Sequence, residues 1–155
     1  MNGCRRTFLK VTGGATALLA AVAAGVLKSG FAGAASRNEG AFASKAVAET
    51  LKSLGAASLI DSRDITITAP DIAENGAVVP IAVTSKIANT QSISIIAEKN
   101  PFPLAATFDM SSGGEPYVST RVKMGQTSNV RAVVKADGKF YTTVKEVKIT
   151  VGGCG

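Results

Sequence analysis

The chain has 155 residues, a length that suits one domain, and carries 17 Lys and Arg against 11 Asp and Glu. Four of the basic residues lie in the first 35 positions; the rest leaves 13 basic residues scattered among 11 acidic ones, so nucleic-acid binding is not supported. Histidine is absent, which excludes a Ser-His or Cys-His dyad and an imidazole metal site. With dispersed carboxylates and no phosphate-binding loop, the sequence predicts no metal, no cofactor and no self-sufficient enzyme.

The first feature along the chain is a targeting pattern. Arg5 and Arg6 are followed by the group Phe8, Leu9 and Lys10. A twin arginine with an aromatic-leucine-lysine group resembles the signal of the twin-arginine export route of bacteria. We therefore expect export to the periplasm.

An apolar region follows the twin arginine at residues 11–27, and it is short and diluted by glycine. The small residues Ala32 and Ala34 form a site typical of signal-peptidase cleavage, so we expect residues 1–35 to be removed as a signal peptide. A retained membrane anchor is the alternative, but a spanning helix needs about 20 strongly apolar residues. Cys4 precedes the apolar region and is expected to be lost with it, so the mature protein has no membrane segment and one thiol.

Residues 36–62 are predicted to contain one helix, from Gly40 to Leu54. Its apolar face has helical spacing and consists of Ala43, Val47, Leu51 and Leu54. Asn38 or Ser36 is suited to cap the start, and Gly55 to the left-handed position after the end. We expect the helix to cover part of a sheet; a partner-binding helix is the alternative.

Residues 63–151 change to a period of two, which predicts about seven short strands. They are expected within residues 63–69, 78–87, 92–99, 104–110, 117–124, 130–135 and 140–151. Turn signals every 8–12 residues indicate an all-β antiparallel sandwich. The dipeptide Asp137-Gly138 favours a two-residue hairpin. Pro80 suggests an edge position or a bulge, and a change of phase between Val144 and Val147 predicts a bulge or a twist near Lys145-Glu146.

The last predicted strand runs directly into Gly152-Gly153-Cys154-Gly155. Glycine has no Cβ and adopts φ values of both signs, so this segment is expected to be a flexible arm that carries a thiol rather than a core element. A frayed tail is the alternative. In an oxidising compartment an odd cysteine implies intermolecular pairing or a thiol with a function, which favours the arm.

Three stretches, together with the arm and the export signal, resemble the SoxY family of the bacterial thiosulfate-oxidising system. The stretches are residues 100–108, 119–128 and 137–155, and the resemblance spans essentially the whole mature chain. The arm is its most specific element, because short strand motifs fit many sandwiches. The family's tail commonly reads Gly-Gly-Cys-Gly-Gly, whereas this sequence has a single glycine after Cys154, which brings the thiol nearer a carboxylate that disfavours the thiolate.

The resemblance implies an immunoglobulin-like sandwich in a heterodimer with a second subunit, SoxZ. It implies that Cys154 holds the sulfur substrate covalently on a swinging arm formed with Gly152, Gly153 and Gly155. The haem enzyme SoxXA would join thiosulfate to the thiol, SoxB would hydrolyse the terminal sulfone, and SoxCD, where present, would oxidise the remaining sulfane sulfur. The protein is thus expected to be a carrier on which other enzymes act.

Three other interpretations remain open. An exported structural subunit could use Cys154 for an intermolecular disulfide, although two preceding glycines suit a permanent link poorly. A thiol oxidoreductase would need a second cysteine or a base near the thiol, and the mature chain has neither. A carrier of another sulfur compound would use the same residues. Met124 is a candidate for the subunit interface, with an ordinary core position as the alternative.

Overall fold

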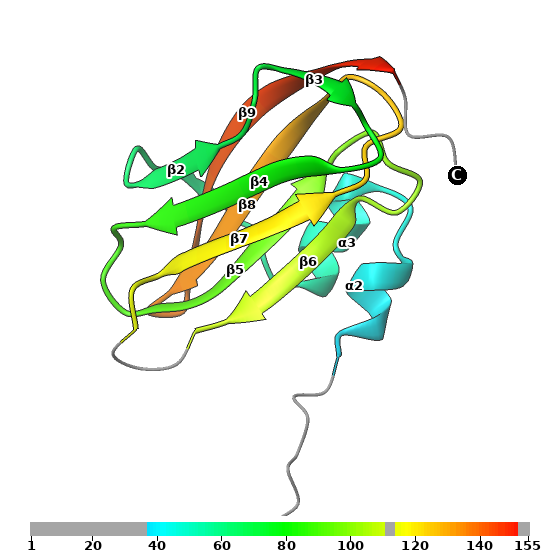
Figure 1. Ribbon diagram of the computed structural model, residues 1–155. Coiled ribbons are helices and arrows are strands. Elements are labelled where there is room, and N and C mark those ends of the chain that lie inside the picture. Colours follow the sequence, from blue (N-terminus) through cyan, green and yellow to red (C-terminus); the bar gives the residue numbers. More distant parts are fainter. Residues whose placement is uncertain (1–36, 111–113, 152–155) are drawn as a thin grey trace, which may run out of the picture. The chain divides into compact units, whose positions relative to one another are not determined.

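The alternating apolar residues of the chain build two β-sheets that pack face to face, with two short helices on the outer face of the larger sheet (Figure 1). The computed structural model describes residues 37–110 and 114–151, which belong to one compact unit. The all-β sandwich expected from the sequence is confirmed. The structure adds a second helix and two short strands to the expected elements.

The helices are α2 (Glu39–Ala43) and α3 (Val47–Ser53). The strands are β1 (Ile60–Asp61), β2 (Ile65–Thr68), β3 (Ile72–Asn75), β4 (Val79–Ser85), β5 (Thr90–Ala97), β6 (Leu104–Asp109), β7 (Tyr117–Val122), β8 (Ser128–Ala136) and β9 (Lys139–Val151). The smaller sheet has the order β2-β4-β7. The larger sheet has the order β1-β9-β8-β5-β6, and β3 also pairs with β9.

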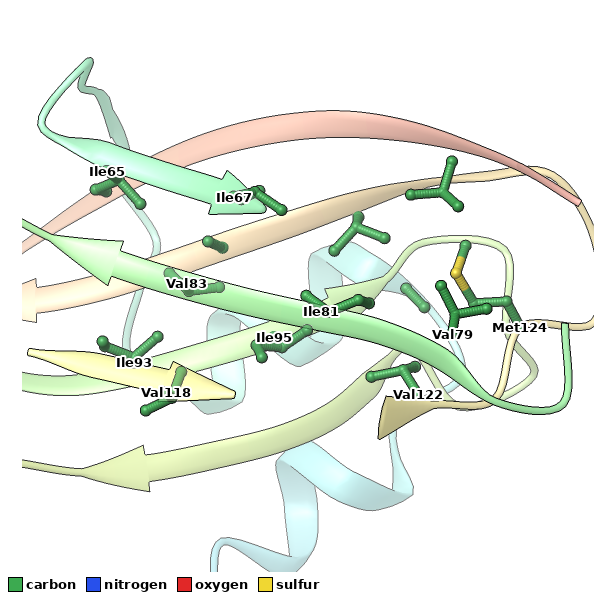
Figure 2. Packing of buried hydrophobic residues seen from close by; sticks show 14 of the residues in the cluster. Ile65, Ile67, Val79, Ile81, Val83, Ile93, Ile95, Val118, Val122 and Met124 are labelled. Carbon is green, nitrogen blue, oxygen red and sulfur yellow. The ribbon is translucent and has the colours of Figure 1, made fainter. Parts of the chain in front are cut away.

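Apolar side chains from both sheets form the main core (Figure 2). Ile81 and Val83 of β4 meet Ile93 and Ile95 of β5, and all four are 0–1% exposed. Met124 follows β7 and lies beside Val79 in the same cluster, fully buried. Met124 is therefore an ordinary core residue, and its candidacy for a subunit interface is wrong.

A second cluster lies on the other face of the larger sheet, between that sheet and the helices. Ile96 and Val133 point away from the main core and pack against Val47, Leu51 and Leu54 of the helical segment. The helical segment thus covers part of the sheet, as its apolar spacing predicts. This second layer buries both faces of β5 and β8 and explains why their burial does not alternate simply.

The single helix expected from Gly40 to Leu54 is wrong: the helical region is split in two. Ser44 and Ala46 are extended, with ψ of 138° and 142°, and interrupt the helix. The expected caps are confirmed, since the Asn38 side chain accepts a hydrogen bond from the Ala41 amide (3.0 Å) and Gly55 has φ of +77°.

The Asp137-Gly138 hairpin is confirmed. Asp137 and Gly138 have φ of +49° and +72°, the signs that a type I′ turn requires, and they join β8 to β9. Of the bulge or twist expected near Lys145-Glu146, the bulge is wrong, because β8 and β9 keep one register over their full pairing. The apparent change of phase arises because Val144 lies on the outer face of the sheet, 41% exposed, while Val147 is buried in the main core.

Two strands were not predicted from the sequence, β1 and β3. Both pair with β9 in parallel, so the sandwich is not purely antiparallel. Pro80 lies in β4, the middle strand of the smaller sheet, but β2 ends its pairing at Ala82. Pro80 is therefore paired with β7 alone. The expected edge position is confirmed for this residue, although β4 as a whole is the middle strand.

Candidate functional site

The candidate site begins where β9 ends. The predicted site residues Gly152, Gly153, Cys154 and Gly155 lie outside the described residues, and so does the export-signal group. The structure does describe the strand from which the thiol-bearing segment continues: β9 runs for 13 residues to Val151. The geometry that follows concerns this root of the arm and its surroundings.

The root of the arm is held from both sides. On one side Asn75 of β3 is in register with Val151, and the Thr150 hydroxyl donates to the carbonyl of Glu74 (3.2 Å). On the other side β9 extends past Ser128, the first residue of the antiparallel strand β8, and the Ile149 amide donates to the Thr127 hydroxyl (3.0 Å). The last residues of β9 are therefore fixed by hydrogen bonds up to the point where the glycines begin.

The turn after β3 is tied to the loop after β7. The Ala77 amide donates to the Asn75 side-chain oxygen (2.8 Å), which closes an Asx turn directly beside the root. The next residue of that turn, Gly76, accepts a hydrogen bond from the Met124 amide (2.7 Å). Because Met124 is anchored in the main core, this bond holds the turn on the core.

A third loop, between β5 and β6, joins this end of the sandwich. The Asn100 side-chain amide donates to the carbonyl of Lys123 (2.7 Å), and the Lys99 amide donates to the Ser128 hydroxyl (3.0 Å). The loops after β3, β5 and β7 thus gather at the end toward which the arrowheads of β3, β5, β7 and β9 point in Figure 1. Exposed apolar side chains stand on two of them, Val78 (51%) and Phe102 (52%).

Lys145 fixes the start of β3 to the body of β9. Its ammonium group donates to the carbonyl of Ala69 (2.6 Å) and lies 3.0 Å from the Asp71 carboxylate. The Lys148 amide donates to the carbonyl of Asp71 (2.9 Å). The two ends of β3 are therefore both bound to β9, one near Lys145 and one at Val151.

Within residues 37–110 and 114–151, no group of His, Cys, Asp or Glu is arranged to hold a metal ion. No helix within that same part of the chain is long and apolar enough to cross a membrane. What the geometry provides is a rigid mount for the segment that carries Cys154.

Comparison with known families decides the assignment. The model of the family described as sulfur oxidation protein SoxY matches residues 51–154, two thirds of the chain and including Cys154. The chain belongs to the SoxY family. The resemblance stated from the sequence is thereby confirmed, and it reaches from the end of the helical segment through every strand.

A solved structure of the sulfur carrier protein SoxY from Chlorobium limicola f thiosulfatophilum is similar, with 43% identity and a TM-score of 0.56. That match covers 61% of this chain and 88% of the other. The human F-spondin reeler domain matches at 8% identity and a TM-score of 0.42, over 59% of this chain and 94% of that one. No curated protein sequence matches the chain.

Sequence reasoning did not single out the residues that hold the root: Asn75, Thr127 and Lys145. The Asn75-Gly76 dipeptide is a turn signal and could have located the Asx turn. Lys145 stands among alternating residues of a strand, where a cation is normally expected to be solvated. Only the parallel pairing of β3 with β9 places Ala69 and Asp71 beside it.

Proposed function

We propose that this protein is a periplasmic carrier that holds sulfur intermediates covalently on Cys154 during thiosulfate oxidation. The observation that carries the proposal is the SoxY family match up to residue 154, together with the fixed end of β9 three residues before that cysteine. In support, the similar protein from Chlorobium limicola f thiosulfatophilum is a sulfur carrier protein. The twin arginine at Arg5 and Arg6 supports export as a folded protein.

Partner enzymes supply the chemistry in this proposal. A free thiol has a pKa of about 8.5 and is only a few per cent thiolate at pH 7. The haem enzyme SoxXA removes two electrons and one proton as the Cys154 sulfur joins the outer sulfur of thiosulfate, which forms a disulfide bond to a sulfonate. SoxB then adds water to the sulfonate sulfur, sulfate leaves, and a persulfide remains on Cys154. SoxCD, where it is present, oxidises that sulfane sulfur. Throughout this cycle the chain is paired with SoxZ in a heterodimer.

The rigid root and the glycines have separate tasks. The hydrogen bonds of Ile149 and Thr150 fix where the arm starts, so the reach of the thiol is set by residues 152–154 alone. Three extended residues span about 10 Å between Cα atoms. Gly152 and Gly153 present no side chain to a narrow active-site channel, so one thiol serves several enzymes.

An intact-mass measurement tests carriage. The mature protein is purified from cells growing on thiosulfate, and its mass is measured with and without reductant, next to a Cys154→Ser variant. A reducible sulfur-bearing adduct on the peptide that contains Cys154, absent from the variant, is the expected result. An unmodified thiol, or a disulfide to one protein under turnover, would overturn carriage in favour of a structural disulfide.

A second measurement tests the glycines. Replacing Gly152 and Gly153 together by valine leaves the thiol in place but adds side chains that a channel must admit. We expect the loading and hydrolysis rates to fall while the reaction of Cys154 with a small thiol reagent changes little. Unchanged turnover with every enzyme would show that the glycines are not needed for entry.

A further inference from the structure

The short distance between β9 and Cys154 constrains what an enzyme must touch. Residues 152–154 span at most about 10 Å between Cα atoms, whatever their conformation. A reacting group that lies inside an enzyme therefore brings the surface of that enzyme against the end of the sandwich at which β9 stops. The side chains exposed at that end are contacted each time the thiol is used.

Five exposed residues of the gathered loops form what we call the arm-end surface: Val78, Lys99, Phe102, Lys123 and Gln126. Val78 is nearest the root, since its amide donates to the carbonyl of Asn75 (3.5 Å), the register partner of Val151. It is 51% exposed.

The other members of the arm-end surface are held in place by hydrogen bonds. Asn100 binds the Lys123 carbonyl, and the Ala97 amide donates to the carbonyl of Pro103 (2.8 Å), which fixes both sides of Phe102. Pro103 is buried, whereas Phe102 stands 52% exposed between two prolines. A rigid loop that presents an aromatic side chain loses little conformational entropy on binding, which favours its use as a contact.

The charge of the arm-end surface has one sign. Glu98, in the same loop as Lys99, is paired with Arg131 (2.7 Å) and its side chain is only 19% exposed. The exposed charges on the loops after β3, β5 and β7 are then Lys99 and Lys123. Acidic side chains on a partner complement this surface and speed its approach.

We propose that the arm-end surface docks the enzymes that react with the sulfur on Cys154. The mouth of such an enzyme places an apolar patch on Val78 and Phe102 and acidic side chains opposite Lys99 and Lys123. This inference rests on the proposed carrier function and deepens it, because it assigns part of enzyme recognition to the folded domain. The arm delivers the thiol, and the arm-end surface sets how tightly each enzyme holds the carrier.

Steady-state loading of Cys154 by the purified thiosulfate-conjugating enzyme tests the proposal, with the full-length mature carrier, in its heterodimer with SoxZ, as the varied substrate. The double variant Val78→Glu/Phe102→Glu is compared with Tyr117→Glu. Tyr117 is 52% exposed, as Phe102 is, but stands at the start of β7, at the opposite end of the sandwich. Thermal unfolding confirms that each variant is folded.

We expect the double variant to raise KM about tenfold or more with little change in kcat, because interface residues of this kind each contribute the equivalent of several-fold in affinity. Tyr117→Glu leaves both constants unchanged. Lys99→Glu/Lys123→Glu lowers kcat/KM, and added salt weakens the wild type more than this variant.

Two outcomes separate the docking surface from carriage itself. The docking proposal is wrong, while carriage stands, if the wild type is loaded and the double variant has the same KM as the wild type. The same holds if Tyr117→Glu raises KM as much as the double variant does. If wild-type Cys154 is never loaded, carriage fails. As a further measure, a synthetic peptide of residues 149–155 should be loaded with a higher KM than the whole protein; an equal KM would contradict docking by the domain.

Discussion

The two sheets of the sandwich differ in how they are covered. β5 and β8 of the larger sheet bury side chains on both faces, against the smaller sheet on one side and the helices on the other. The smaller sheet buries one face, and its other face carries exposed or half-exposed residues such as Thr66, Pro80 and Thr84. The comparison shows that the burial pattern of a strand depends on whether one or both of its faces are covered. Buried and exposed residues alternate regularly in β2 and β4, whereas this alternation is lost in β5.

The largest expected effect comes from the layer that both sheets share. Ile95 is fully buried between them, so Ile95→Ala leaves a cavity and should lower the free energy of unfolding by about 4 kcal/mol. Chemical denaturation measures the change. Thr84→Ala on the outer face of the smaller sheet is the control and should stay within about 0.5 kcal/mol. Similar losses in the two variants would contradict the single-sided coverage of that sheet.

Residues in the layer between the larger sheet and the helices should contribute less to the free energy of unfolding than residues in the main core. Ile96 is also fully buried, but the larger side chains of its cluster in the helical segment, Phe42, Val47, Leu51 and Leu54, are only partly buried and can settle into the space. We expect Ile96→Ala to lower the free energy of unfolding by about 2 kcal/mol. Hydrogen exchange should accelerate in α3 more than in β4. Equal acceleration in both would show that the helices are not a separate layer.

The contact of Lys145 with the start of β3 has the next largest expected effect on the free energy of unfolding. Lys145→Met removes a charged hydrogen bond to the Ala69 carbonyl and should cost about 1 to 1.5 kcal/mol, below the usual range because the side chain is 32% exposed. Asp71→Asn removes the charge of a partner that is 89% exposed and should cost less than about 0.5 kcal/mol. Denaturation of both variants tests the order; a larger loss for Asp71→Asn would reverse this assignment.

An effect somewhat smaller than that of Lys145→Met is expected at the hairpin of the larger sheet. Gly138 has φ of +72°, and a Cβ added there would meet no other atom within 4 Å, so Gly138→Ala costs only backbone strain, about 1 kcal/mol. Gly138→Asn should recover part of this loss, since Asn tolerates the left-handed region. Thermal melts give the comparison. Equal melting temperatures for Gly138→Ala and the wild type would argue against the left-handed turn.

Seven of the nine strands in the described residues could be predicted from the sequence, because each has its pattern within its own residues. The sequence did not reveal β1 or β3. These strands have two and four residues, and their pairing depends on β9, about half the chain away. The break at Ser44 was not predicted, because the helical spacing of the apolar residues continues across it from Ala43 to Val47.

The candidate site was predictable in part. The arm that we propose was inferred from the sequence alone, because glycines on both sides of a cysteine are a local pattern. The fixed root and the arm-end surface were not, since Asn75, Thr127 and Asn100 come from three separate loops that only the folded sandwich brings together. A contact between distant loops leaves no periodic trace in either of them.

The parallel pairing of β1 and β3 with β9 also orders events during synthesis. Both short strands are made well before β9, their partner. Until β9 is complete they have no ladder, and long-range pairings of this kind form slowly. The newly made chain thus exposes unpaired strand edges until β9 is available, a state prone to aggregation. Folding and readiness of the thiol-bearing segment are therefore coupled: the strand that closes the sandwich is the one that leads into Cys154.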